Sequence, residues 1–259
     1  MYKWLQALKI ILSLLCLSYA SWQDYRFREV PNKIWVIFAP FGLTLNVLDI
    51  FYSQDFFLLI NLATSVFVVS GLSICLFYLG FFGGADAKAL ICLSMTLPNA
   101  PVLFRFKVIP NLFSLSVFDN AILISALLAF FLAIYNVIWH VNKEESLFEG
   151  LEHESVWKKF LALITGYKVE FSKIKESHLS PLEEVVRLGD GRLLRRLKIF
   201  IKVEEKPKRA QIERLSVEPD EKIWVTPDLP FIIFITLGLV VNFVIGDLIL
   251  LVTSSFILL

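Results

Sequence analysis

Six long apolar runs constrain this chain more than any other feature of its sequence. A helix needs about 20 predominantly apolar residues to cross the hydrocarbon region of a membrane. Runs close to that length lie at residues 5–22, 34–52, 56–82, 87–103, 117–139 and 229–259. With 57% hydrophobic residues over 259 positions, the chain carries more apolar surface than one water-soluble core buries. The sequence therefore predicts an all-α integral membrane protein with about six transmembrane helices.

The charged residues are concentrated in one segment of the chain. About two thirds of the 25 basic and 24 acidic residues fall at positions 142–226, between the fifth and the sixth apolar run. Apolar residues there recur with a helical period over 157–164 and alternate as in strands over 168–174 and 197–203. We therefore expect a five-helix membrane region at 1–141, a small soluble α+β insert at 142–226 and a C-terminal transmembrane helix at 227–259.

The charge balance and the scarcity of cysteines argue against several classes of function. A nucleic-acid-binding protein needs a surplus of basic residues on one face, whereas the net charge here is only +1. Cys16, Cys75 and Cys92 lie singly in apolar runs, and the three histidines lack metal-ligand spacing. We expect no nucleic-acid partner, no disulfide framework, no metal site and no cofactor, with membrane lipid around the helices.

The basic residues of the short loops predict the orientation in the membrane, because cytoplasmic loops carry the excess of Lys and Arg. Arg26, Arg28 and Lys33 mark the first loop, Lys88 marks the third, and the charged insert lies on the same side. We assign that side to the cytoplasm and both termini to the outside, against the opposing charges of Lys3 and Lys9. Residues 24–26 form no small-residue cleavage site, so we expect the first run to be a retained helix rather than a signal peptide.

Two aspartates stand at run ends on the predicted cytoplasmic side. Asp24 follows the first run, and Asp86 follows Gly83, Gly84 and Ala85, where the third run meets the fourth. Ionisable groups in or near the membrane are costly and tend to be kept for function, although the cost is smaller at the boundary. The small residues before Asp86 leave room for another helix or an extended substrate backbone beside its carboxylate. The alternative is a hinge or ordinary small-residue helix packing.

The segments around both aspartates resemble those of a family of membrane peptidases. Residues 83–88, Gly-Gly-Ala-Asp-Ala-Lys, look like the glycine-x-small-aspartate signature of the type IV prepilin peptidases, with Ala85 at a position most often occupied by glycine. Residues 23–32 are similar to the family's other aspartate segment, in which a basic stretch and Val-Pro-Asn follow the aspartate. Residues 222–231 resemble the run that opens the last helix of archaeal preflagellin peptidases. The related presenilin group carries a Pro-Ala-Leu motif, which this sequence lacks.

The resemblance implies an intramembrane aspartic endopeptidase whose catalytic residues are Asp24 and Asp86, with Gly83, Gly84 and Ala85 beside the substrate. It implies substrates with a short basic leader and a hydrophobic N-terminal helix, namely archaellin or type IV pilin-like precursors cut at the cytoplasmic membrane face. Bacterial relatives also methylate the product and carry a cysteine-rich zinc loop, so this chain is expected to cleave without methylating. Which aspartate acts as base stays open, and the rival for a place in the pair is Asp228.

A different class of function is also compatible with the residues alone. In a non-enzymatic membrane protein, such as a small transporter or a filament-assembly partner, the two aspartates would pair with bases or line an ion path. A transporter usually has polar residues near the midpoints of its spans or interrupted helices in matching halves, and neither pattern is evident. Hydrolysis of a precursor by the purified protein discriminates between the two classes.

The predicted orientation is tested by cysteine labelling in intact cells, in a background without the native cysteines. A cysteine at Ser177 in the insert should resist a membrane-impermeant maleimide, because the insert is assigned to the cytoplasm. A cysteine at Ser53, in the loop assigned to the outside, should react and serves as the control. Labelling at position 177 would contradict the assignment, including the side on which the two aspartates lie.

Overall fold

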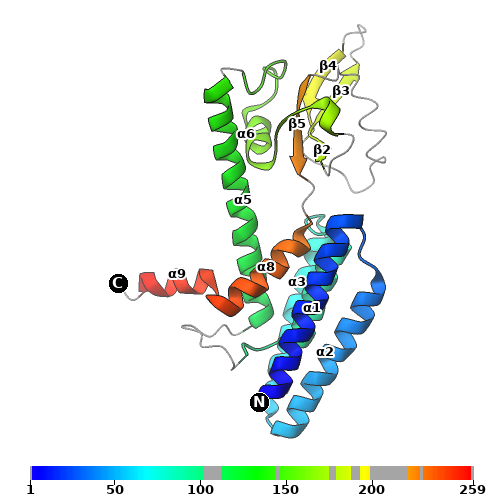
Figure 1. Cartoon of the computed structure of the whole chain (residues 1–259). Helices are drawn as coiled ribbons and strands as arrows, with labels where there is room; N and C mark the ends of the chain where they lie inside the picture. The colour runs from blue at the N-terminus through cyan, green and yellow to red at the C-terminus, as the bar shows by residue number, and fades with distance from the viewer. Residues whose placement is uncertain are drawn as a thin grey trace. The chain divides into compact units, whose positions relative to one another are not determined.

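The computed structural model describes residues 2–101, 112–143, 146–174, 179–187, 193–198, 221–227 and 230–257. Two compact units make up the protein, one from Met1–Ser125 with Leu229–Leu259 and the other from Ala126–Asp228. The first unit is helical, and the second contains a short helix and strands (Figure 1). A small strand-containing region before the last helices is therefore confirmed, while the boundaries at 141 and 227 stay predictions.

The helices of the first unit supply the membrane-crossing segments. Among the described residues these helices are α1 (Lys3–Phe27), α2 (Asn32–Ser53), α3 (Phe56–Tyr78), α4 (Gly84–Thr96), α5 (Phe113–Lys143), α8 (Phe231–Val244) and α9 (Leu248–Ile257). Four of them, α1, α2, α3 and most of α5, are long and apolar enough to cross a membrane, and α8 with α9 makes a fifth if that bent pair counts as one span. A multi-pass membrane protein is thus supported, but six spans are not confirmed.

Helix α4 occupies the place of the expected fourth span and is shorter than a span. Its 13 residues extend for about 20 Å at 1.5 Å per residue, against a hydrocarbon core of about 30 Å. The helix ends before Pro98 because a residue that precedes proline avoids helical dihedral angles, and Leu97 has φ −123° and ψ 67°. Helix α4 packs against α1, α2, α3 and α8, and Ala89, Leu90 and Leu93 are fully buried. It is the central helix of the first unit.

The last apolar run is broken rather than forming the single predicted helix. Helices α8 and α9 are bent by 51° at a break where Gly246 adopts a positive φ of 102°. Asp247 caps α9 by accepting a hydrogen bond from the backbone N–H of Leu250 at 2.9 Å. Asn120 of α5 donates to the carbonyl of Gly246 and accepts from the N–H of Leu248. These bonds satisfy backbone groups that the break would otherwise leave unpaired in an apolar setting.

The second unit contains two small antiparallel sheets. Its elements besides the end of α5 are α6 (Val156–Thr165), β1 (Tyr167–Glu170), the 3-10 helix η1 (Phe171–Ile174), β2 (Leu179–Pro181), β3 (Glu183–Arg187), β4 (Leu193–Leu197) and β5 (Lys222–Pro227). Strand β5 lies between β1 and β2, and β3 pairs with β4. The helical period over 157–164 is confirmed as α6, and the alternation over 168–174 gives β1 followed by η1. Residues 199–203 of the other predicted strand lie outside the described residues.

Buried side chains hold the strands of the second unit together. Trp224 of β5 is fully buried, stacks on Phe148 at 5.1 Å and donates its indole N–H to the carbonyl of Leu147 at 2.9 Å. The backbone N–H of Trp224 donates to Glu183 at 2.7 Å, and Arg195 forms an ion pair with the same carboxylate at 2.6 Å. Burial raises the pKa of the Glu183 carboxyl above its usual value, and Arg195 only partly offsets that effect. Glu183 therefore links β3, β4 and β5 rather than facing solvent.

A buried ion pair joins α1 to α2 far from the first loop. Lys9 Nζ lies 2.8 Å from Asp49 Oδ2 and 2.9 Å from Asn46 Oδ1, and both members of the ion pair have side chains that are 2% exposed. Asn46 in turn donates to the backbone carbonyls of Met95 and Thr96 at the end of α4. A charge buried in an apolar bundle is tolerated when it is paired and hydrogen-bonded. Lys9 is thus part of the helix packing, which explains why its charge stands against the orientation that the loops predict.

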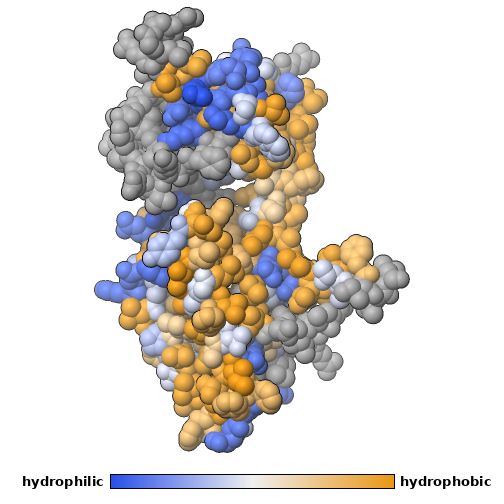
Figure 2. All heavy atoms as spheres, turned by 180° about the vertical axis from the view of Figure 1, so that it is seen from behind, coloured by the Kyte–Doolittle hydropathy of each residue, from blue (hydrophilic) through white to orange (hydrophobic). Residues whose placement is uncertain are grey.

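The surface of the helices is apolar over a wide area. Figure 2 shows hydrophobic residues covering much of the visible face of the helical unit, with hydrophilic residues gathered on the strand-containing unit. Large exposed side chains include Phe41 at 62%, Phe67 at 82% and Phe131 at 63% exposure. A continuous apolar surface of this extent marks contact with lipid or a partner. Together with the four long apolar helices, it indicates contact with membrane lipid.

The Lys9–Asp49 pair generates a stability prediction. Lys9→Met should lower the free energy of unfolding by about 3 to 5 kcal/mol, because it leaves the Asp49 carboxylate buried without its partner. The double variant Lys9→Met with Asp49→Leu should regain most of that loss, since it removes both charges together. The measurement is SDS-induced unfolding of the purified protein in detergent micelles, followed by circular dichroism. A Lys9→Met protein as stable as the wild type would contradict the role of the Lys9–Asp49 ion pair in helix packing.

Candidate active site

Asp24 lies in the last turn of α1, where the helix stops before the loop. Arg28 is the C-cap of the helix: it adopts the left-handed conformation with φ 59° and donates its backbone N–H to the carbonyl of Asp24 at 3.0 Å. The Asp24 side chain is half-buried, and the positive charge of Arg28 acts on it. The helix end thus holds this carboxyl at the edge of the bundle, still open to an incoming group.

Asp86 lies in the first turn of the central helix α4 and is 8% exposed. Its Oδ2 accepts a hydrogen bond from the backbone N–H of Gly83 at 3.0 Å, so the carboxylate caps its own helix. The backbone amide of Ile232, in the first turn of α8, is close enough to act on the same carboxylate. Within the described part of the chain, Oδ1 has no hydrogen-bond partner and is shielded from solvent. One oxygen is therefore fixed, and the other is left for a further group.

The structure brings the two aspartates to one cavity of about 380 Å³. The residues that line this cavity, called here the acid cavity, are Asp24, Arg28, Glu29, Val30, Trp35, Gly83, Gly84, Ala85, Asp86 and Lys88. The two carboxyls are near enough for the charge of Asp24 to act on Asp86. All five residues singled out from the sequence, two acids and three small residues, therefore share one site.

The small residues differ in how closely they approach Asp86. A Cβ atom built on Gly83 would lie 3.1 Å from Asp86 Oδ2, which is tighter than an ordinary contact. A Cβ atom on Gly84 would meet only the ring of Phe77, at 3.8 Å, and Ala85 packs against the apolar core. Gly83 is thus the residue whose missing side chain matters most for the carboxylate.

A side-chain hydrogen bond joins the two aspartate segments. Lys88, two residues after Asp86 in α4, donates a hydrogen bond from its Nζ to Asn32 Oδ1 at 2.8 Å, and Asn32 begins α2 directly after Pro31. The sequence predicted Lys88 only as a topology anchor, and the bond gives it a second role. Because the pair is exposed, its contribution to stability is small, and its main effect is to keep the loop after Asp24 beside the start of α4.

Two components of the site were not predicted from the sequence. Trp35 faces the acid cavity from the first turn of α2, and the N-terminus of α8 presents the amide of Ile232 to Asp86. The only sequence signal for the second component was the resemblance over 222–231, which marked where the last helix opens. Asp228, the rival to the two aspartates, lies outside the described residues.

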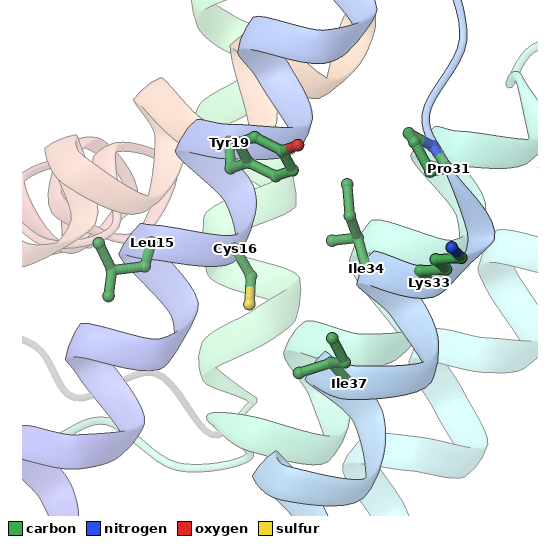
Figure 3. Close-up of a pocket in the computed structure, with 7 residues that line it drawn as sticks. All are labelled: Leu15, Cys16, Tyr19, Pro31, Lys33, Ile34 and Ile37. Carbon is green, nitrogen blue, oxygen red and sulfur yellow. The ribbon is translucent and has the colours of Figure 1, made fainter.

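A larger hollow between α1 and α2 has a different character. Figure 3 shows Leu15, Cys16 and Tyr19 of α1 opposite Pro31, Lys33, Ile34 and Ile37, around a volume of about 480 Å³. Among the described residues that line this hollow there is no Asp or Glu, and most of them are aliphatic. Ile34 faces it, whereas the next residue, Trp35, lines the acid cavity. Neither Asp24 nor Asp86 lines the hollow, whereas both line the acid cavity, so the acid cavity is the candidate active site.

Comparison with known proteins assigns the chain to a family. Residues 11–138, which include both aspartates, match the type IV leader peptidase family, and residues 158–248 match the archaeal peptidase A24 C-terminus type II. A preflagellin peptidase of Methanococcus maripaludis is 28% identical over 250 residues, covering 94% of this chain and 97% of the relative. The chain belongs to the type IV leader peptidase family.

Further relatives agree with this membership over nearly the whole length. A preflagellin peptidase of Methanocaldococcus jannaschii is 27% identical over 255 residues, covering 93% of this chain and 94% of the relative. One from Methanococcus voltae is 26% identical over 247 residues, covering 92% of this chain and 95% of the relative. Membership of a leader peptidase family supports the peptidase interpretation over the transporter that the residues alone left open.

The glycines of the acid cavity give a graded prediction with a matched control. Gly83→Ala should slow leader cleavage roughly tenfold, because the new Cβ displaces the Asp86 carboxylate by a few tenths of an ångström and catalysis is sensitive to small misplacements. Gly84→Ala adds the same atom where there is room and should stay close to the wild-type rate. Initial rates at matched amounts of folded protein test this order, and equal rates for the two variants would contradict it.

Proposed function

We propose that this chain is an aspartic endopeptidase that removes the leader from preflagellin-like precursors. The observation that carries the proposal is the acid cavity, which is lined by both Asp24 and Asp86 from segments far apart in the sequence. The relatives named preflagellin peptidase, aligned over 92% or more of this chain, support the class of substrate. A type IV pilin-like precursor carries the same chemistry and is a second substrate of the same class.

The proposed reaction uses the two carboxyls as a pair that holds one proton. Two carboxylates a few ångströms apart do not both ionise readily, so the pair titrates as a unit. One carboxylate takes a proton from water, whose oxygen attacks the scissile carbonyl carbon, while the protonated carboxyl donates a hydrogen bond to the carbonyl oxygen. The tetrahedral intermediate then collapses, the C–N bond breaks, and a carboxyl delivers a proton to the leaving nitrogen. Both carboxyls change protonation state during the cycle, so neither is replaceable by an amide.

The position of the pair suits a substrate with a short polar leader and a long apolar helix. Asp24 lies at the end of a membrane-crossing helix, next to the loop between Arg28 and the start of α2, where Lys33 lies, so the scissile bond would lie at the membrane boundary. We assign that boundary to the cytoplasmic face because the basic loop residues lie there. The apolar helix of the precursor would stay among the helices while its leader remains in water. Glu29, an exposed carboxylate on the rim of the acid cavity, offers a partner for a basic leader residue.

The proposed activity stops at hydrolysis. The chain contains three cysteines, Cys16, Cys75 and Cys92, all free and separated in the sequence, so they do not form the cysteine-rich zinc loop of the methylating relatives. We therefore expect the new N-terminus to leave as a free amine. Intact-mass measurement of the mature product, after reaction in the presence of S-adenosylmethionine, tests this expectation. A gain of one methyl group would contradict it.

The roles of the aspartates are tested by amide substitution. Asp24→Asn and Asp86→Asn should each abolish cleavage of a leader-bearing precursor, with helix content and detergent stability preserved, because an amide does not exchange the shared proton. Asp228→Asn should retain most activity, and Asp55→Asn, which alters the cap of α3, is a control for amide substitution at a helix end. Turnover near the wild-type level in either of the first two variants would remove that aspartate from the mechanism.

A further inference from the structure

Trp35 lines the acid cavity and carries an unused hydrogen-bond donor. It lies in the first turn of α2, is 6% exposed, and its ring packs in the main apolar core. Within the described residues its indole Nε1–H has no hydrogen-bond partner and is shielded from solvent. Buried polar groups in folded proteins are nearly always paired, so a buried indole N–H without a partner needs an explanation.

Position at a membrane interface does not explain this indole. Tryptophans near the ends of membrane helices usually turn their N–H toward the headgroup region, where water and lipid satisfy it. Trp4 and Trp22, on α1, are 54% and 47% exposed and fit that pattern. Trp35 instead lines the cavity that contains Asp24 and Asp86, enclosed by protein. Its N–H is thus directed to protein-enclosed space rather than to the membrane surface.

A second residue that lines the acid cavity, Asp86, carries an unpaired acceptor. Asp86 Oδ1 is also buried without a partner among the described residues, whereas Oδ2 is held by Gly83. In the part of the chain that the structure describes, the other buried side-chain atoms without partners belong to Gln6, Ser73 and Asn242, none of which lines this cavity. A peptide group offers a carbonyl that accepts and an N–H that donates, so an extended backbone complements this pair of groups.

We propose that the Trp35 indole N–H donates a hydrogen bond to a backbone carbonyl of the substrate, next to the scissile bond, and so positions the extended precursor beside Asp86. This inference rests on the proposed leader peptidase function. This hydrogen bond stabilises the bound substrate and the transition state equally, a case known as uniform binding. Its loss therefore raises KM and leaves kcat nearly unchanged. Trp35 is a substrate-binding residue rather than a third acid or base.

Substitution of Trp35 by phenylalanine tests the contribution of the N–H donor separately from that of the aromatic ring. Trp35→Phe keeps an aromatic side chain in the core and removes the N–H, and it should raise KM for the precursor by about three- to tenfold, the usual effect of one hydrogen bond. Trp4→Phe makes the same change at an exposed position outside the acid cavity and should leave KM unaltered. Equal KM values for Trp35→Phe and the wild type would overturn the inference. So would a loss confined to kcat.

A spectroscopic readout tests the contact without relying on activity. The protein is labelled with 15N at the indole nitrogens in the inactive Asp24→Asn background, and the Trp35 signal is assigned by its absence from Trp35→Phe. Adding a synthetic precursor peptide, with its leader and first helical residues, should move the Trp35 indole proton downfield while the Trp4 signal stays in place. A Trp35 signal that does not move at saturating peptide would overturn the inference.

The inference and the proposed function fail in distinguishable ways. If the wild-type protein in liposomes does not cut the precursor, the function fails whatever the Trp35 signal does. If the wild type cuts the precursor and Asp86→Asn does not, the function stands, and the KM of Trp35→Phe decides the inference by itself. Matched helix content and unfolding midpoints for the Trp35→Phe protein and the wild type ensure that the comparison reports on binding rather than on folding.

Discussion

The arrangement of this protein depends on a short helix buried at the centre of its helical unit. Helix α4 touches α1, α2, α3 and α8, and its residues Ala89, Leu90 and Leu93 are fully enclosed. Helix α4 begins directly after Gly83 and ends before Leu97. Its first turn carries Asp86. Small residues make such packing possible: a Cβ atom on Gly42 of α2 would overlap Thr96 of α4. The carboxyl is thus positioned by helix packing rather than by a loop.

Two polar clusters in this unit differ in how fully their members are paired. Lys9, Asp49 and Asn46 satisfy one another and the end of α4, as buried charges in an apolar setting must. Around Asp86 the pairing is incomplete, since its Oδ1 and the indole N–H of Trp35 are buried without partners among the described residues. Unpaired polar groups are expensive, so a cavity whose lining residues carry an unpaired donor and an unpaired acceptor is suited to a polar ligand. A peptide backbone is such a ligand.

Much of this architecture was predictable from apolar runs, because the physical requirement for crossing a membrane is length and apolarity. Helices α1, α2, α3 and α5 follow that rule. The fourth run is not confirmed as a span, since its helix ends before Pro98, and the sixth contains a bend at Gly246 and Asp247, so it counts as one span only if the bent pair is taken together. Both breaks have a local sequence signal. The Lys9–Asp49 pair has none, since it depends on how α1 and α2 face each other.

The acid cavity was only partly predictable. Asp24, Asp86 and the small residues stood in recognisable segments, and the structure places them together. Trp35 gave no signal, because a tryptophan near a helix end is usually an interfacial residue, and only its burial and unpaired N–H set it apart. The approach of the α8 N-terminus to Asp86 is a tertiary feature that no local pattern encodes.

The central claim is that Asp24 and Asp86 act as one pair that shares a proton. The most direct measurement is the pH dependence of kcat for the wild-type protein in liposomes with a leader-bearing precursor. The account predicts a bell-shaped profile, because the active form is singly protonated and is lost both when the pair takes up a second proton and when it gives up the shared one. A profile with a single ionisation, or one that is flat across the acid range, would contradict it.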